Sequence, residues 1–294
     1  MAAKTGLLAY YTQQSVITDP GDYGRLLEEL PRNIPGLCAA IQGLLIHTWK
    51  IRRDGIDLSP ERRAEIEIRG MARLLARIQE VDDRPLTVVR PLEKLLVVDC
   101  RHFATLLCAI LRYQGVPARA RCGFAAYLES THWQDHWVCE YWHAPRKRWV
   151  LVDADVLDYD VSRDRFFPAT KAWQLCRAGH ADPNQFGFAP EARGLWAVRA
   201  DMVRDLAALN RCELLCIDAW GLIDEKEDGD LSTDDLALLD EVAALHQAGE
   251  QDLPRLRTLY EMDQRLRVPR TIRSWVYWAE GVKTVDLVRE GVMP

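Results

Sequence analysis

The sequence predicts an α+β fold in which one helix packs on a small antiparallel sheet, with helical segments on both sides of this core. An apolar period typical of a helix follows Cys100, and it changes after Pro117 to the alternation typical of strands. No linker composition separates the parts, so we expect a single compact domain over residues 1–294. Its parts are expected to be a helical N-terminal part, the core and a helical C-terminal part, over residues 1–95, 96–200 and 201–294.

Composition limits the possible classes of function. The chain has 294 residues, a hydrophobic content of 48% and a net charge of −6, which favours a packed core and argues against a nucleic-acid partner. No apolar run approaches the length of a membrane span, and the N-terminus lacks the apolar stretch of a signal peptide. The cysteines are scattered and form no CxxC pair, so we expect reduced thiols and a cytoplasmic location.

The N-terminal part is expected to be helical after an irregular lead-in over residues 1–20. Residues 22–81 predict a short helix that ends near Pro31, a second helix that begins at Pro35, and a third that follows a Ser59 cap. The apolar stripe of the second helix runs from Leu37 to Trp49. Residues 83–98, which contain two prolines, are expected to form the connection to the core.

The central helix is predicted to begin at Cys100. Asp99 is a typical N-cap, and the helix is expected to end at Gly115 and Pro117. Its buried face consists of Phe103, Leu106, Leu107, Ile110 and Leu111. Cys100 therefore lies in the first turn, where free N–H groups and the helix dipole lower the pKa of a thiol and favour the nucleophilic thiolate. The alternative is a small buried side chain without chemistry.

Three strands are expected at residues 118–124, 136–142 and 149–153, the last two forming a hairpin across a turn at 144–147. We expect loops and a short helix near Trp173 over residues 154–190. Beyond them, we expect a strand at 194–198 and helices at 201–210, 233–247 and 253–266. The acidic run 224–230 is interpreted as a solvated connection, because Lys226 stands where a calcium loop needs an oxygen ligand.

The hairpin suggests a base for Cys100. If its turn is centred between Ala144 and Pro145, His136 lies directly opposite Asp153. Residues opposite each other share a face, with Cβ atoms about 5 Å apart. An aspartate there accepts from one imidazole nitrogen and leaves the other for the thiol, which is the arrangement of a nucleophile, base and orienting acid.

Weaker alternatives exist for the base and the acid. His102 lies two residues after Cys100 on the same helix, so the two side chains do not face each other. The remaining candidates lie in loops or beyond the strand end: His132, His143, Asp155 and Asp158. No pair of Cys and His residues has the spacing of zinc ligands, so we expect no metal and no cofactor.

Three segments, DCRHFATLLCAILRYQGVPARARCGF, DHWVCEYW and WVLVDAD, resemble the transglutaminase-like superfamily in sequence and order. This papain-type cysteine fold is shared by transglutaminases, peptide N-glycanases and many bacterial relatives, and the resemblance covers roughly residues 90–155. It implies a papain/transglutaminase-like core with Cys100 as nucleophile, His136 as general base and Asp153 as orienting acid. Relatives often have aspartate where this chain has His102, a change expected to alter the electrostatics beside the thiol.

The expected chemistry is acyl transfer through a thioester, from an amide or ester substrate to water or an amine acceptor. The backbone N–H of Cys100 is one oxyanion donor, and Gln42 is a candidate for the second because papain-like sites often use an upstream glutamine. Trp133 and Trp137 are candidates to line a substrate cleft, with core packing as the alternative. Arg119 is a candidate to bind a carboxylate, with solvated charge as the alternative.

Two hypotheses about the function follow. The first is a transglutaminase-like cysteine hydrolase or acyltransferase whose substrate is a protein, a peptide or a small molecule. The second is a non-catalytic transglutaminase-like binding module that uses the helical surfaces at 22–81 and 233–280. Retention of all three candidate residues favours the enzyme.

Overall fold

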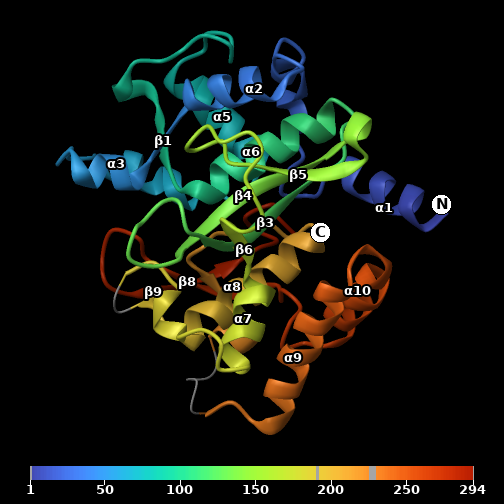
Figure 1. Ribbon diagram of the computed structural model, residues 1–294. Coiled ribbons are helices and arrows are strands. Elements are labelled where there is room, and N and C mark those ends of the chain that lie inside the picture. The colour runs from blue at the N-terminus through green and yellow to red at the C-terminus, as the bar shows by residue number, and fades with distance from the viewer. Residues whose placement is uncertain (1, 190–191, 225–229, 294) are drawn as a thin grey trace.

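The core is one helix packed on one antiparallel sheet. The computed structural model describes residues 2–189, 192–224 and 230–293, and Figure 1 shows their arrangement. Helix α6 (Cys100–Tyr113) packs on a four-stranded antiparallel sheet in the order β5-β4-β3-β6. The strands are β3 (Ala118–Ala125), β4 (Gln134–His143), β5 (Arg148–Val152) and β6 (Phe166–Pro168). The predicted α+β core, with the cysteine at the start of its helix, is confirmed.

Both faces of this sheet are covered. Every residue of β3 is buried, because α6 packs on one face and α8 (Leu195–Leu209) on the other. The solvated position given as the alternative for Arg119 was therefore wrong. Arg119 forms an ion pair with Glu140 at 2.6 Å, and Arg121 forms one with Asp205 of α8 at 2.8 Å. Buried charges of this kind need partners, and α8 supplies one of them.

The N-terminal part contains more than helices. Its elements are α1 (Ala2–Thr12), α2 (Ile34–Gln42), β1 (Leu45–His47), α3 (Thr48–Arg53), α4 (Pro60–Arg63), α5 (Met71–Val81) and β2 (Leu96–Val98). The expected irregular lead-in includes α1, and the expected second helix ends early at Gln42. Strand β1 follows and pairs with β2 in parallel. Leu45 and Ile46 enter two different apolar clusters, so this short strand is buried on both sides.

The C-terminal part combines helices with a small sheet. Its helices besides α8 are α7 (Ala169–Arg177), α9 (Thr233–Ala248) and α10 (Leu253–Met262), and its antiparallel strands are β7 (Asp218–Ala219), β8 (Thr271–Trp275) and β9 (Val282–Asp286). The part is helical as expected, but the strands β7, β8 and β9 accompany its helices. The strand expected at 194–198 was wrong, because α8 begins directly after Gly194, whose φ of 117° suits glycine.

Short 3₁₀ helices connect these elements: η1 (Gly21–Leu27), η2 (Ala64–Glu67), η3 (Leu92–Lys94), η4 (Ala144–Arg146), η5 (Pro183–Gln185), η7 (Gly221–Ile223) and η9 (Glu250–Asp252). Most of the acidic run at 224–230 lies outside the described residues. Within the described ranges, no helix has the length and apolar character needed to cross a membrane. In Figure 1, α2 and α5 lie on the α6 side of the sheet and α7 to α10 on the other. We therefore propose that the parts form one domain.

The buried charges of the sheet predict that Glu140→Leu strongly destabilises the fold. This change leaves Arg119 buried without its carboxylate, and we expect the free energy of unfolding to fall by about 3–5 kcal/mol. Urea unfolding measures it. The control is Asp160→Asn, which breaks exposed ion pairs with Arg146 and Arg148 and should cost at most about 1 kcal/mol. Equal losses in the two variants would contradict a buried charge network.

Candidate active site

Cys100 is the first residue of α6, as predicted, and its side chain is almost buried, with 9% exposed. The preceding Asp99 has extended backbone, but its carboxylate is held by side chains. Its Oδ1 lies 2.7 Å from Nδ1 of His102, and its Oδ2 accepts from the Cys216 thiol at 3.0 Å. His102 is fully buried and its Nε2 lies 2.9 Å from the carbonyl oxygen of Ile68. His102 therefore ties the start of α6 to the segment before α5.

The pKa of the Cys100 thiol differs from the sequence expectation. Burial raises this pKa well above its usual range, and the charges of Asp99 and Asp135 raise it further. The backbone N–H of Trp137 is directed at the thiol and acts in the opposite sense. The expected lowering by the helix terminus was wrong, because loss of solvent and nearby carboxylates both disfavour a thiolate. Burial and nearby charge therefore favour the protonated thiol over the thiolate.

His136 and Asp153 are brought together, although by a register other than the expected one. The hairpin pairs Cys139 with Val152 and His143 with Arg148, so its turn is centred one residue later than predicted. His136 is therefore diagonal to Asp153 and on the same face, a position from which longer side chains still meet. Its Nε2 lies 2.7 Å from Oδ2 of Asp153.

The Asp153 carboxylate is fully engaged although it is buried. Oδ2 also accepts from the Tyr127 hydroxyl at 2.8 Å, and Oδ1 accepts from the backbone N–H groups of Asp155 and Val156 at 3.0 and 3.3 Å. Burial alone would lower the pKa of His136, but attraction to Asp153 outweighs it and raises this pKa. Burial alone would likewise raise the pKa of Asp153, yet the interaction with His136 lowers it. The pair therefore favours an imidazolium beside a carboxylate.

The hydrogen bond to Asp153 occupies Nε2 of His136 and leaves Nδ1 for another partner. Among the described residues, no hydrogen bond joins His136 to the Cys100 thiol in this state. The thiol instead faces the backbone N–H of Trp137, which is the next residue of β4. The Cys100 thiol therefore lies beside the residue that follows His136 on β4.

In the described part of the chain neither alternative acid is hydrogen-bonded to His136, although the charge of Asp155 acts on its pKa. Asp155 is buried, and burial raises its pKa to about 6. Its Oδ2 lies 3.9 Å from Nε2 of His47, and its Oδ1 lies 4.0 Å from Nζ of Lys50. Asp158 forms an ion pair with Arg165 at 3.0 Å.

The other candidate residues have structural partners. Nε2 of Gln42 donates hydrogen bonds to the carbonyl oxygens of Ala154 and Asp155, each at 2.7 Å, so the amide N–H groups of Gln42 are occupied. Trp133 stacks on Phe167 with ring centroids 4.1 Å apart, and Trp137 is buried in the cluster that contains Cys100. These contacts match the packing alternative for both tryptophans. Arg119 is on the sheet face covered by α8, not the face covered by α6, and it lies over the Trp149 ring instead of in solvent.

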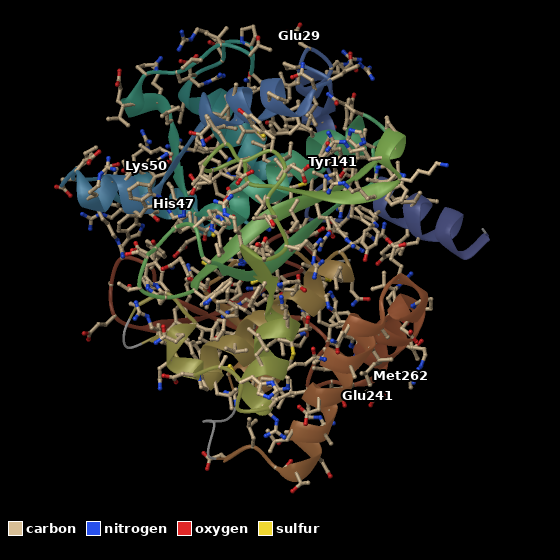
Figure 2. The ribbon with its side chains drawn as sticks, viewed as in Figure 1. Glu29, His47, Lys50, Tyr141, Glu241 and Met262 are labelled. Carbon is tan, nitrogen blue, oxygen red and sulfur yellow. The ribbon has the colours of Figure 1, made fainter. Side chains whose placement is uncertain are left out.

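Sequence reasoning missed His47. This residue ends β1, and Figure 2 shows it beside Lys50 at the start of α3. The parallel pairing of β1 with β2 places His47 opposite Val98, two residues before Cys100. No local period reveals this, because the two strands are separated by about fifty residues of chain. The signal in the sequence was a histidine directly after an apolar run.

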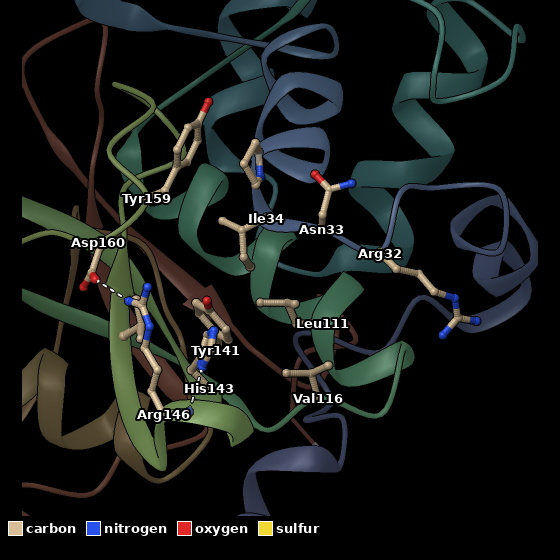
Figure 3. A pocket seen from close by; sticks show the side chains of 12 residues that line it. Arg32, Asn33, Ile34, Leu111, Val116, Tyr141, His143, Arg146, Tyr159 and Asp160 are labelled. Carbon is tan, nitrogen blue, oxygen red and sulfur yellow. Dashed lines mark hydrogen bonds and ion pairs between the residues drawn. The ribbon is translucent and has the colours of Figure 1, made fainter.

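A groove of about 490 Å³ lies at the other end of α6 (Figure 3). Leu111, Val116 and Tyr141 contribute to its lining. Leu111 is eleven residues after Cys100, about 16 Å along the helix axis, so this groove does not reach the thiol. In the described ranges no cluster of His, Cys, Asp and Glu side chains is arranged to hold a metal ion.

Comparison with known families is informative over the core. The model of the transglutaminase-like superfamily matches residues 64–154. The chain contains a transglutaminase-like superfamily domain. This transglutaminase-like domain includes Cys100, His136 and Asp153, and it begins before the core boundary expected at residue 96. No curated protein and no solved structure matches the chain.

The carboxylates around Cys100 predict how its reactivity responds to charge. We expect alkylation by iodoacetamide to show an apparent thiol pKa above the free value of about 8.5. Asp155 is ionised at pH 8 and disfavours the thiolate, so Asp155→Asn should speed labelling of Cys100 there by roughly fivefold, for about 1 kcal/mol of repulsion removed. Peptide mass spectrometry measures the rate. The control Asp54→Asn removes the same charge from an exposed site on the far end of α3. An equal gain in both variants would mean that only net charge matters.

Proposed function

We propose that the protein is a cysteine-dependent acyl-transfer enzyme that acts on an amide or ester carbonyl. The observation that carries this proposal is the 2.7 Å contact between His136 and Asp153, beside the helix that begins with Cys100. Cys100 is the nucleophile, His136 the base and Asp153 the acid that orients the base. Membership of the transglutaminase-like superfamily supports the same roles.

The first half-reaction moves one proton and forms one bond. Sγ of Cys100 attacks the carbonyl carbon while Nδ1 of His136 takes the thiol proton, and the carbonyl π electrons move to the oxygen. When this intermediate collapses, the bond to the leaving group breaks, and the leaving amine or alcohol takes the proton from His136. Water or an amine then resolves the thioester. The raised pKa of the thiol favours proton transfer during attack over a thiolate formed beforehand.

A non-catalytic binding module is the second candidate, and the 9% exposure of Cys100 favours it. The two candidates differ in a simple observable, which is turnover at Cys100. A binding module tolerates loss of the thiol, whereas the proposed mechanism does not.

Turnover of an activated acyl donor, such as a p-nitrophenyl ester, tests the proposal. We expect the wild-type protein to release nitrophenol catalytically and Cys100→Ala to release none above background, because the nucleophile is absent. Cys176→Ala is the control, since that half-buried cysteine lies on α7 and should be dispensable. Equal turnover in wild type and Cys100→Ala would reject the enzyme.

The pH dependence of kcat tests the roles of His136 and Asp153. His136 accepts a proton only when it is neutral, and its pKa is raised, so we expect activity to fall as the pH drops through a value above 6.5. Asp153→Asn removes the charge that raises this pKa. The acid limb should then move to lower pH, while kcat falls by about 10²–10⁴-fold. An acid limb that does not move in Asp153→Asn would contradict the pairing.

A further inference from the structure

The second donor for the oxyanion is missing from the site as described, because the Nε2 group of Gln42 is already bonded to two carbonyl oxygens. The backbone N–H of Cys100 is free of an intrahelical partner, as in the first turn of any helix. An effective oxyanion hole needs preorganised donors at the same point. A second donor must therefore be a side chain near Cys100 whose N–H or O–H group is not already bound.

His47 is held beside the start of α6 by two independent contacts. Strand pairing sets it opposite Val98, where neighbouring strands are about 4.8 Å apart. Its ring also stacks on Phe103, with centroids 6.4 Å apart and an interplanar angle of 18°. Phe103 is three residues after Cys100 and on the same side of α6. The imidazole therefore lies along the helix face that carries the thiol.

His47 and the Cys100 thiol share two acidic neighbours. Asp99 acts on the pKa of both side chains. Asp155 lies 3.9 Å from Nε2 of His47 and also acts on the pKa of Cys100. These two carboxylates therefore lie near both side chains.

The hydrogen bonds of His47 fix where its proton resides. Nδ1 accepts from the backbone N–H of Trp49 at 3.2 Å, which caps α3. The hydroxyl of Thr48 lies 3.3 Å from the same nitrogen and 2.7 Å from the hydroxyl of Tyr277. An acceptor at Nδ1 requires the proton on Nε2 in the neutral ring.

The Nε2–H group is left without an acceptor. Across the part of the chain that the structure describes, its closest carboxylate is that of Asp155, and 3.9 Å is too long for a hydrogen bond. Burial lowers the pKa of His47 to about 3, so the ring stays neutral at ordinary pH. The side chain keeps 12% exposure, so it is not sealed from an entering group. A neutral, fixed N–H beside the thiol is the type of donor that a developing oxyanion needs.

We propose that Nε2–H of His47, together with the backbone N–H of Cys100, donates to the oxyanion formed when Cys100 attacks a carbonyl. This role rests on the proposed function. It makes His47 a catalytic residue separate from the base His136, since His47 donates a hydrogen bond and neither takes nor gives up the transferred proton.

Two reactions of the same thiol separate this role from a structural one. Acylation by p-nitrophenyl acetate passes through a tetrahedral oxyanion, whereas alkylation by iodoacetamide displaces iodide and develops none. We expect His47→Phe, which keeps an aromatic ring for Phe103, to slow acylation of Cys100 by about 10²–10³-fold. Alkylation should stay at the wild-type rate. His47→Gln, which retains an N–H donor, should recover part of the acylation rate.

His143→Phe is the matched control. Nδ1 of His143 also accepts the N–H of a short helix, from Arg146 at 3.1 Å, but this residue lies at the distant end of the hairpin. We expect both reactions to be unchanged in this variant. Circular dichroism confirms folding, and His47→Gln serves as the second variant if His47→Phe does not fold.

The possible failures are distinct. A wild-type protein that is not acylated would overturn the proposed function, and the role of His47 with it. Acylation at the same rate in wild type and both His47 variants would overturn the role of His47 alone. Acylation and alkylation that slow together would show that His47 supports the thiol and does not bind the oxyanion.

Discussion

The arrangement of the site depends on one buried carboxylate, that of Asp153. A buried charge is stable only when its oxygens are hydrogen-bonded, and this one accepts from a histidine, a tyrosine and two backbone N–H groups. These hydrogen bonds to Asp153 fix the positions of the His136 ring on β4 and of the loop that follows β5. Gln42 holds the same loop from α2. The orientation of His136, the proposed base, therefore follows from the hydrogen bonds that one buried carboxylate requires.

Burial also determines the state of the thiol. The helix terminus favours a thiolate, but loss of solvent and the nearby charges of Asp99 and Asp135 raise the pKa of Cys100 and favour the thiol. A raised pKa on His136 makes that side chain a stronger base. The raised pKa values of Cys100 and His136 are consistent with a mechanism in which the proton moves as the sulfur attacks.

Local patterns predicted much of the core and less of its surroundings. The helical period after Cys100 and the alternation after Pro117 have local physical causes, and so the helix and three strands were found. The hairpin turn was expected at 144–147, where η4 and Lys147 form it, but its centre was taken one residue too early and lies between Pro145 and Arg146. The β1–β2 pairing and the packing of α8 on β3 join distant segments, which periodicity does not encode. His47 and the burial of Arg119 were missed for this reason.

The most direct test of the account is to trap the acyl-enzyme. The protein is mixed briefly with a p-nitrophenyl ester and quenched in acid, and peptides containing each of the eight cysteines are examined by mass spectrometry. The account predicts one acyl group, bound as a thioester at Cys100, and its absence in His136→Ala. An acyl group spread over several cysteines, or found at Cys100 equally in His136→Ala, would contradict the proposed roles of Cys100 and His136.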